Sequence, residues 1–329
     1  MQLSMRRRIF IGLLALLSVA AVAALATAPP SLVKKPSVFQ LDADLDGYLS
    51  ATEHAISAHT PIIPNTEKRI RWFQAGSQSK TVFSIVYLHG FSATRQEIAP
   101  VLALVADGLE ANLFETRLAG HGLDTDALVG VRAEDWLDDA AEALQIGAAI
   151  GERVIVMGTS TGATLALAIV DHPSFERVSS LVLISPNFGP RDMSSEFLTW
   201  PGGPQLAYLV AGDTHSWTPH NELQARYWSY RYPMDALVEM MRLVKFVRAQ
   251  LPLGLEQDLL AIYSPRDEVV DTGRIISSIE QINSPRKLIV EFNGSDDSSH
   301  HVLAGDIMAP DNNGPLVQQI IDFVTAGPR

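Results

Sequence analysis

Two kinds of apolar pattern alternate along most of the chain. Short runs of β-branched residues are followed by longer stretches in which apolar residues recur every three to four positions. The runs are typical of buried strands, and the longer repeat is typical of helices that pack on a sheet. The predicted strands cover residues 81–88, 111–118, 153–157, 180–185, 259–263 and 287–292, and the predicted helices cover 96–109, 134–150, 163–170 and 316–325. This alternation predicts an α/β protein with a mostly parallel central sheet and helices on both faces.

The alternation is interrupted between the fourth and fifth predicted strands, at about residues 187–252. This segment is predicted to be a helical insertion, and it contains most of the tryptophan and tyrosine of the chain. These residues are Trp200, Tyr208, Trp217, Tyr227, Trp228, Tyr230 and Tyr232. Two interpretations stay open and are compatible: a subdomain with its own aromatic core, and a lid whose aromatic side chains line an apolar pocket.

Two further segments precede the alternating region, which spans residues 67–329. In residues 1–28, three arginines are followed by an uncharged apolar run at 9–26, a pattern typical of an export signal or a single membrane anchor. Both readings stay open, because the small residues near position 26 specify a cleavage site only weakly. In either case the remainder should face outward, in the periplasm or anchored at the inner membrane. Residues 29–66 are predicted to form a linker and an acidic extension.

Composition narrows the functional classes. A chain of 329 residues with 47% hydrophobic content suits one large α/β domain with additions. The net charge of −12 argues against nucleic acid as a partner. The absence of cysteine excludes disulfides, thiolate metal sites and a cysteine nucleophile.

The segment Gly158-Thr159-Ser160-Thr161-Gly162 lies between a predicted strand and a predicted helix. In this setting a Gly-x-Ser-x-Gly pattern predicts a nucleophile elbow, a tight turn that exposes the serine hydroxyl at the N-terminus of the helix. The two glycines allow the strand and the helix to approach each other closely. Ser160 is therefore the predicted nucleophile.

A serine hydroxyl needs a base to take its proton and an acid to orient that base. In sheets of this type the order along the chain is serine, acid, histidine. Asp267, after the fifth predicted strand, is the predicted acid, and its neighbour Glu268 is the alternative. His301, after the sixth predicted strand, is the predicted base. The adjacent His300 should then be exposed or bonded nearby.

A negatively charged tetrahedral intermediate needs two N–H donors. One should come from Thr161, directly after the nucleophile, and the other from Phe91, in the loop after the first predicted strand. His89 and His121 lie in glycine-containing loops at strand ends. We expect these two histidines to shape the backbone rather than to act as the base.

An acidic stretch near the N-terminus matches the spacing of an EF-hand calcium loop. Its ligand positions would be Asp42, Asp44, Asp46, Tyr48, Ser50 and Glu53, with Gly47 at the sharp turn. The stretch contains a single such loop, whereas EF-hands usually pair, and Pro36 leaves little room for an entering helix. A structural calcium site and a simple cap for a helix at residues 50–58 both stay open.

Several motifs occur in a fixed order, namely His89-Gly90-Phe91, Arg117 to Gly122, Gly158-x-Ser160-x-Gly162, Asp267, and His301-Val302. The set covers roughly residues 67–326 and resembles the α/β-hydrolase superfamily, in particular its carboxylesterase and monoacylglycerol-lipase branch. The resemblance implies an α/β-hydrolase fold, a Ser-Asp-His triad and no cofactor for catalysis. It also implies hydrolysis of a small-molecule or lipid-like carboxylic ester through an acyl-enzyme. Thr159 is a departure, because the family often has histidine before the serine.

Two other functions stay open on the same scaffold. The same triad could cleave an amide, a lactone or a thioester, since triad geometry does not distinguish these substrates. The chain could also be a surface-anchored binding protein that keeps the fold without catalysis, because fold alone does not fix function.

Overall fold

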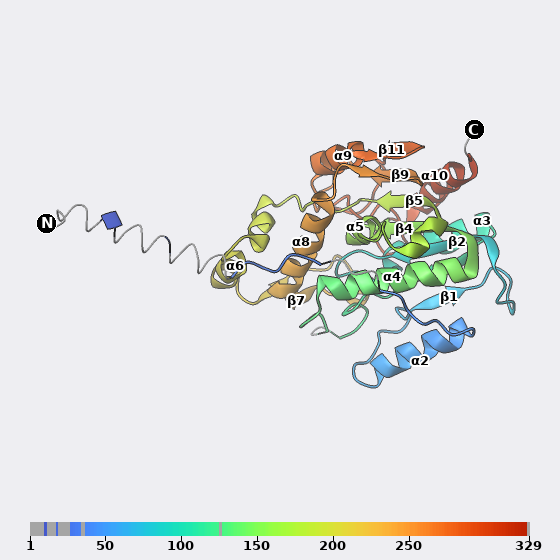
Figure 1. Ribbon diagram of the computed structural model, residues 1–329, viewed down its shortest axis with the longest axis horizontal. Coiled ribbons are helices and arrows are strands. Elements are labelled where there is room, and N and C mark those ends of the chain that lie inside the picture. Colours follow the sequence, from blue (N-terminus) through green and yellow to red (C-terminus); the bar gives the residue numbers. More distant parts are fainter. Residues whose placement is uncertain (1–9, 12–17, 19–26, 34–36, 125–126, 328–329) are drawn as a thin grey trace.

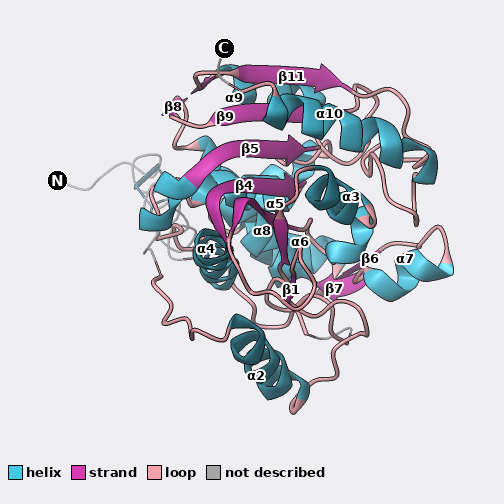
Figure 2. Ribbon diagram, turned by 90° about the vertical axis from the view of Figure 1, so that its right-hand side faces the viewer, coloured by secondary structure: helices cyan, strands magenta, loops and turns pink. Residues whose placement is uncertain are grey.

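A seven-stranded sheet lies at the centre of the computed structural model, which describes residues 10–11, 18, 27–33, 37–124 and 127–327. The strand order is β1-β3-β2-β4-β5-β9-β11, and all neighbours are parallel except β1, which runs antiparallel to β3. Figure 2 shows β4, β5, β9 and β11 side by side and pointing the same way. This confirms the predicted sheet. The strands are β1 (Arg69–Arg71), β2 (Thr81–Leu88), β3 (Asn112–Glu115), β4 (Gly151–Thr159), β5 (Val178–Ile184), β9 (Asp258–Tyr263) and β11 (Lys287–Glu291).

Successive residues of the central strands point into two different cores, because side chains alternate across a sheet. In β4, Val154 and Val156 belong to one buried cluster, whereas Ile155 and Met157 belong to the other. Residues from α4 (Ala133–Ile150), α5 (Thr161–Ala168), α8 (Met234–Arg248) and α9 (Thr272–Glu280) complete the first cluster, and residues from α3 (Val101–Gly108) and α10 (Asn313–Thr325) complete the second. Both faces of the sheet are therefore buried, which explains the continuous apolar runs.

The element boundaries mostly follow the apolar pattern. The first predicted strand, 81–88, coincides with β2. The predicted helix at 96–109 is instead divided into a short 3₁₀ turn, η1 (Arg95–Ile98), and helix α3. The division falls at Pro100, which has no backbone N–H for a continuous helix. Strand β1 and helix α9 were not predicted from the sequence.

The segment between β5 and β9 is a largely helical insertion, as predicted. It comprises η3 (Met193–Thr199), α6 (Gly203–Ala211), β6 (Thr214–Ser216), α7 (Glu222–Tyr227), β7 (Arg231–Pro233) and α8. Strands β6 and β7 form a small antiparallel sheet. Helix α8 returns to the main domain and packs on α5, the helix that follows the predicted elbow. The remaining short elements are η2 (Pro173–Arg177), β8 (Leu253–Gly254), β10 (Ile282–Asn283) and η4 (Pro310–Asn312).

The N-terminal extension contributes one helix, α2 (Leu45–Ser57), which lies on the outside of the domain near β1 and α4 (Figure 1). Buried polar contacts fix it there. Arg117 donates to both carboxylate oxygens of Glu53, at 2.9 and 3.0 Å, and the Tyr48 hydroxyl donates to Glu142 at 2.6 Å. The extension is thus part of the folded domain.

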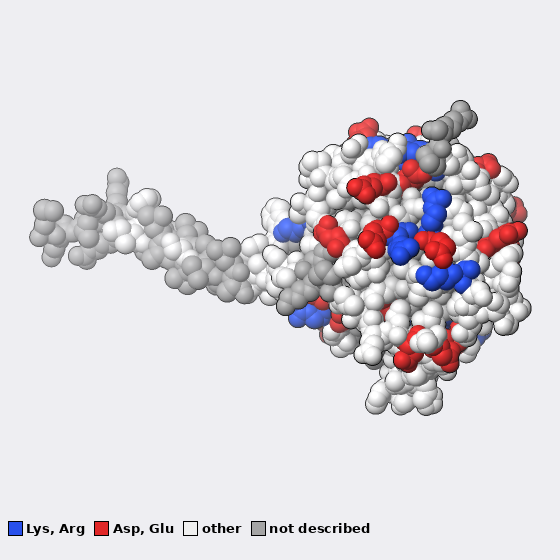
Figure 3. All heavy atoms as spheres, turned by 45° about the vertical axis from the view of Figure 1, so that its right-hand side comes forward, with Lys and Arg blue, Asp and Glu red and all other residues white. Residues whose placement is uncertain are grey.

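The predicted apolar run at 9–26 lies outside the described residues, apart from positions 10, 11 and 18. Within the described part of the chain, no helix combines the length and the apolar character needed to cross a bilayer. On the face drawn in Figure 3, acidic and basic side chains are interspersed with large uncharged areas.

Candidate active site

Ser160 lies in the sharp turn between β4 and α5. Its backbone has φ 53° and ψ −117°, a conformation that side-chain-bearing residues rarely adopt. A Cβ atom at Gly158 would lie 2.6 Å from the Ala163 nitrogen, and a Cβ atom at Gly162 would overlap the Leu88 carbonyl. Both glycines are therefore required by close backbone approach, and the turn has the geometry of a nucleophile elbow.

His301 and Asp267 form a hydrogen-bonded pair that is largely buried. The distance between His301 Nδ1 and Asp267 Oδ2 is 2.7 Å, and the Asp267 side chain is fully buried. The other oxygen of Asp267 accepts from the N–H groups of Val269 and Val270, at 2.8 and 2.9 Å. Burial lowers the pKa of His301, but the charge and the hydrogen bond of Asp267 outweigh it, so the pKa is raised above its ordinary value.

The predicted triad residues all lie at the same edge of the sheet. Ser160, Asp267 and His301 follow the carboxyl ends of the parallel strands β4, β9 and β11. Ser160 and His301 line the same cavity, although their side chains are not hydrogen-bonded to each other in the structure. Such a bond is often long or absent in a ligand-free enzyme and tightens only when substrate binds.

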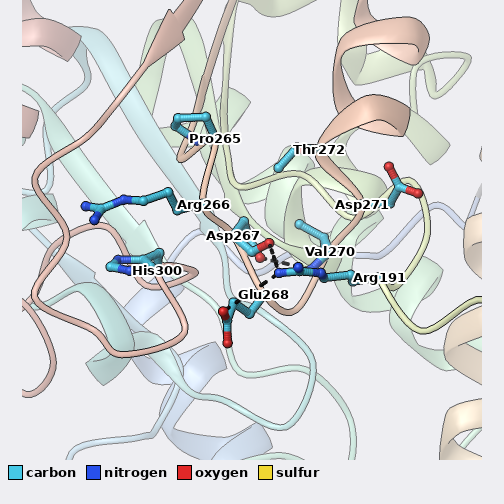
Figure 4. A pocket seen from close by; sticks show the side chains of 9 residues that line it. All are labelled: Arg191, Pro265, Arg266, Asp267, Glu268, Val270, Asp271, Thr272 and His300. Carbon is cyan, nitrogen blue, oxygen red and sulfur yellow. Dashed lines mark hydrogen bonds and ion pairs between the residues drawn. The ribbon is translucent and has the colours of Figure 1, made fainter.

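The alternative residues at these two positions face elsewhere. His300 has φ 52°, and its Nδ1 lies 3.2 Å from the Ser295 carbonyl oxygen. It lies beside Arg266 in a second, polar hollow of about 490 Å³ (Figure 4). Glu268 also lines this hollow, with its side chain mostly exposed and Arg191 at 3.9 Å. The structure therefore pairs Asp267 with His301 rather than their neighbours.

The predicted oxyanion donors flank the serine. Phe91 and Thr161 both line the cavity that Ser160 lines. Neither backbone N–H donates to an acceptor within the described chain, so both are free to bind a ligand atom. The Phe91 ring packs edge-on against Trp136 and Tyr232, at centroid distances of 5.9 and 5.1 Å, and these contacts fix the position of the loop.

His89 and His121 support the backbone of this region, as predicted. Nε2 of His89 accepts from Leu118 N–H at 3.0 Å, and Nε2 of His121 accepts from Ser92 N–H at 3.0 Å. Burial, with the nearby His121 and Arg117 adding to it, holds the pKa of His89 well below its ordinary value. Burial lowers the pKa of His121 to about 4. Both rings are therefore neutral at physiological pH.

The cavity over Ser160 has a volume of about 410 Å³ and is mainly apolar. The insertion supplies much of its wall, including Trp217, Trp228, Tyr232, Leu237 and Met240. Trp228 and Tyr227 also belong to a small buried cluster, together with Ala93, Val302 and Met308 of the main domain. The aromatic side chains of the insertion thus line the cavity, as one interpretation predicted, and its action as a lid stays a prediction. Its buried aromatic residues pack with the main domain rather than in a core of their own.

The predicted calcium loop is not formed. Helix α2 begins at Leu45, inside the proposed loop, and Asp44 caps it by accepting from Gly47 N–H. Asp46 accepts from Trp72 Nε1 at 2.9 Å, and Glu53 pairs with Arg117. Asp42, Tyr48 and Ser50 complete the predicted set, but no group of three or more acidic or histidine side chains in the described part of the chain is placed to hold a metal ion. In the structure these oxygens serve helix capping and ion pairing instead, and calcium binding by this stretch stays a prediction.

Two buried acids near the site were missed in the sequence. Asp297 accepts from the N–H groups of His301 and Val302, at 3.0 and 3.1 Å, and thereby holds the loop that carries the base. Burial raises its pKa, but these bonds and the Ser299 hydroxyl outweigh burial, so the pKa is lowered. Glu97, on η1, is also buried beside the serine loop. Neither residue belongs to a motif, and only its place in a loop after a strand could have pointed to Asp297.

Known proteins that are similar to this chain share its fold. The model of the alpha/beta hydrolase family matches residues 85–321. No relative was found among curated protein sequences. A solved structure described with LipS and LipT, two metagenome-derived lipolytic enzymes, is similar with a TM-score of 0.64 and 17% identity, over 80% of this chain and 99% of that one.

Two lipases are also similar in structure. A monoacylglycerol lipase from Paleococcus ferrophilus has a TM-score of 0.57 and 11% identity, over 78% of this chain and 99% of that one. A monoglyceride lipase variant from Saccharomyces cerevisiae has a TM-score of 0.55 and 12% identity, over 77% and 90% of the two chains. Identities this low establish the fold alone. The fold and the family model together show that the chain belongs to the alpha/beta hydrolase family.

Proposed function

We propose that this protein is a serine hydrolase that cleaves carboxylic esters through an acyl-enzyme. The proposal rests on one observation: Ser160, held at φ 53° in an elbow, shares an apolar cavity with a histidine that is bonded to a buried aspartate. Lipolytic names among the structural neighbours support an ester as the substrate class. Which esters the protein cleaves depends on the volume and the lining of the cavity.

The proposed reaction uses groups that surround the cavity. Ser160 Oγ attacks the ester carbonyl carbon while Nε2 of His301 takes the hydroxyl proton, and Asp267 stabilises the resulting imidazolium. The carbonyl oxygen becomes negative and accepts from the N–H groups of Phe91 and Thr161. The carbon–oxygen bond to the alcohol then breaks, and His301 returns the proton to the leaving alcohol. Water repeats the sequence on the acyl-enzyme, releasing the acid and the free serine.

The walls of the cavity favour an apolar acid part. Trp217, Trp228 and Leu237 offer apolar surface, and about 410 Å³ is enough for a short or medium acyl chain. A small-molecule or lipid-like ester fits this description. We propose that catalysis needs no cofactor, since the roles of nucleophile, base, acid and oxyanion donor all fall to residues of the chain. Dialysis against EDTA should leave turnover unchanged.

Turnover of p-nitrophenyl esters of graded acyl length tests the proposal. Ser160→Ala should lose nearly all activity, by about 10⁴-fold or more, because the nucleophile is absent. Ser57→Ala, at an exposed position on α2, is the matched control and should be fully active. Undiminished turnover in Ser160→Ala would exclude this serine as the nucleophile. A parallel panel of amides, lactones and thioesters decides whether another class of acyl compound is preferred to esters. No turnover of any substrate would favour a binding protein.

We further propose that the N-terminal segment exports the chain and holds it at the membrane. The support is the sequence of residues 6–26 together with an apolar surface close to residues 29–32. Pro30 and Leu32 pack beside Thr199 and Phe246. The nearby η3, α6 and the turn between them expose apolar side chains, including Phe197, Trp200, Leu206, Leu209 and Val210. Export with the segment retained predicts full-length protein in the membrane fraction, and a shortened, soluble periplasmic form would instead show a cleaved signal.

A further inference from the structure

A buried acid beside the active site has no role in the reaction described above. Glu97 lies on η1, is 3% exposed, and is not among the residues that line the cavity over Ser160. A buried carboxyl group costs folding free energy unless its oxygens are hydrogen-bonded. The partners of Glu97 therefore indicate what the residue contributes.

The carboxyl group connects two loops of the site through a chain of hydrogen bonds. Glu97 Oε1 accepts from Gly90 N–H at 2.7 Å and from the Tyr87 hydroxyl at 2.6 Å. The same hydroxyl lies 2.8 Å from Thr159 Oγ1. Gly90 directly precedes Phe91, and Thr159 directly precedes Ser160. The chain of bonds thus joins the residue before an oxyanion donor to the residue before the nucleophile.

Contacts at both its N–H and its carbonyl oxygen fix the position of Gly90. A Cβ atom there would lie 3.0 Å from Glu97 Oε2 and 3.4 Å from the Ser160 Cβ, so the glycine lies between the acid and the nucleophile. Its carbonyl oxygen accepts from Ala93 N–H at 3.2 Å and lies 2.9 Å from His89 Nδ1. The carbonyl of Gly90 and the N–H of Phe91 belong to one planar peptide group, so these bonds also set the direction of the Phe91 N–H.

We propose that Glu97 is a positioning residue for the oxyanion hole. Through the hydrogen bonds of Tyr87 and Thr159, it also fixes the position of the nucleophile elbow. The inference rests on the proposed function, because it assumes a reaction with an oxyanion. It also gives a role to Thr159, the departure from the family pattern before the serine: its hydroxyl is the last member of the hydrogen-bonded chain.

The electrostatic surroundings agree with this placement. Burial raises the pKa of Glu97 to about 7, while the bonds from Tyr87 and Gly90 and the charge of His301 act in the opposite direction. The titratable groups that lower the pKa of Glu97 are thus Tyr87 from β2 and His301 from the loop after β11. Both belong to elements that carry the active site.

The test compares three variants with the wild-type chain. Glu97→Met keeps the length of the side chain and removes both acceptor oxygens, whereas Glu97→Gln keeps one acceptor for Gly90 N–H. Glu152→Gln, at an exposed position on β4, is the matched control. The readouts are kcat and KM for a p-nitrophenyl ester, and the rate at which a fluorophosphonate labels Ser160, since its phosphoryl oxygen occupies the oxyanion hole.

Loss of one oxyanion donor lowers kcat by about 10²- to 10³-fold. A donor that is displaced but still present should lower kcat by a smaller factor. Glu97→Met should therefore lower both kcat and the labelling rate by roughly 30- to 100-fold, with KM changed less than about twofold. Glu97→Gln should recover most of the loss, and Glu152→Gln should match the wild type. A purely structural role would lower the melting temperature in Glu97→Met without this loss of kcat at constant KM.

The outcomes separate the two proposals. If the wild-type serine is not labelled, the proposed function fails. If it is labelled and folded Glu97→Met reacts at the wild-type rate, the positioning role is overturned while the proposed function stands. Should Glu97→Met not fold, Thr159→Val tests the far end of the same chain of bonds. A loss of about tenfold in kcat at constant KM supports the proposal, and wild-type kinetics contradict it.

Discussion

At the scale of single residues, the site depends on groups held by bonds to the backbone. Asp267 accepts two N–H groups and pairs with His301, and Asp297 accepts two more from the loop of that histidine. Spacing and order in the sequence predicted Ser160, Asp267 and His301 as the site residues, because each follows a strand. They could not identify Asp297 or Glu97, because a buried acid that binds loop N–H groups leaves no periodic or motif signature.

The raised pKa of His301 predicts the pH dependence of activity. The base must be neutral to take the serine proton, so kcat/KM should fall as the pH drops through the pKa of His301. Because this pKa is raised, the midpoint should lie above about 6.5, the ordinary value for histidine. A pH profile of ester hydrolysis checks this. Asp267→Asn should move the midpoint to lower pH, and a wild-type midpoint below 6 would contradict the assignment.

Removal of the Asp297 carboxylate should loosen the His301 loop. Asp297→Ala leaves the buried N–H groups of His301 and Val302 without their acceptor, which costs about 1–3 kcal/mol for each unsatisfied group. We expect kcat to fall about tenfold or more with KM little changed, since the base is displaced. Asp297→Asn keeps one acceptor oxygen and should lose less. Equal kinetics for the wild type and Asp297→Ala would rule out this positioning role.

At the scale of elements, the close approach of β4, β2 and α5 exposes the nucleophile. The apolar runs predicted β2 within its observed bounds, and the Gly-x-Ser-x-Gly context predicted the turn. The division of the helix at 96–109 was missed, and so were β1 and α9. Both short strands and short helices at the sheet periphery depend on tertiary packing more than on local pattern.

Substitution in the elbow should not be tolerated. A Cβ at position 162 would overlap the Leu88 carbonyl on the neighbouring strand, so Gly162→Ala must push α5 away from β2. We expect a loss of at least about 2 kcal/mol in the free energy of unfolding, and little or no ester turnover. Denaturant unfolding monitored by circular dichroism measures the first effect. Gly314→Ala, where an added Cβ would meet no neighbouring group within 4 Å, is the matched control.

At the scale of the whole molecule, the N-terminal extension is fastened to the domain by the pair of Glu53 and Arg117. In the structure, acids within the EF-hand spacing of Asp42 to Glu53 cap a helix or pair with an arginine far along the chain. The sequence alone does not contain the contact between α2 and Arg117, which lies 64 residues away. The insertion, in contrast, could be recognised from its aromatic content.

Breaking this pair should destabilise the protein. Both side chains are buried, so Glu53→Gln leaves the Arg117 charge without its partner. A broken buried ion pair costs about 3–5 kcal/mol, and the remaining amide oxygen should reduce this to the lower end. Urea unfolding of Glu53→Gln against Glu152→Gln measures the difference. Equal stability would show that the extension is held by other contacts.

The central claim is that Ser160 is a nucleophile activated by His301 and Asp267. Fluorophosphonate labelling of the wild-type chain, followed by peptide mass mapping, tests it most directly. The account predicts one adduct per chain on the peptide that contains Ser160, no adduct in Ser160→Ala, and much slower labelling in His301→Ala. An adduct on a different residue, or a folded wild-type protein that is not labelled at all, would contradict it.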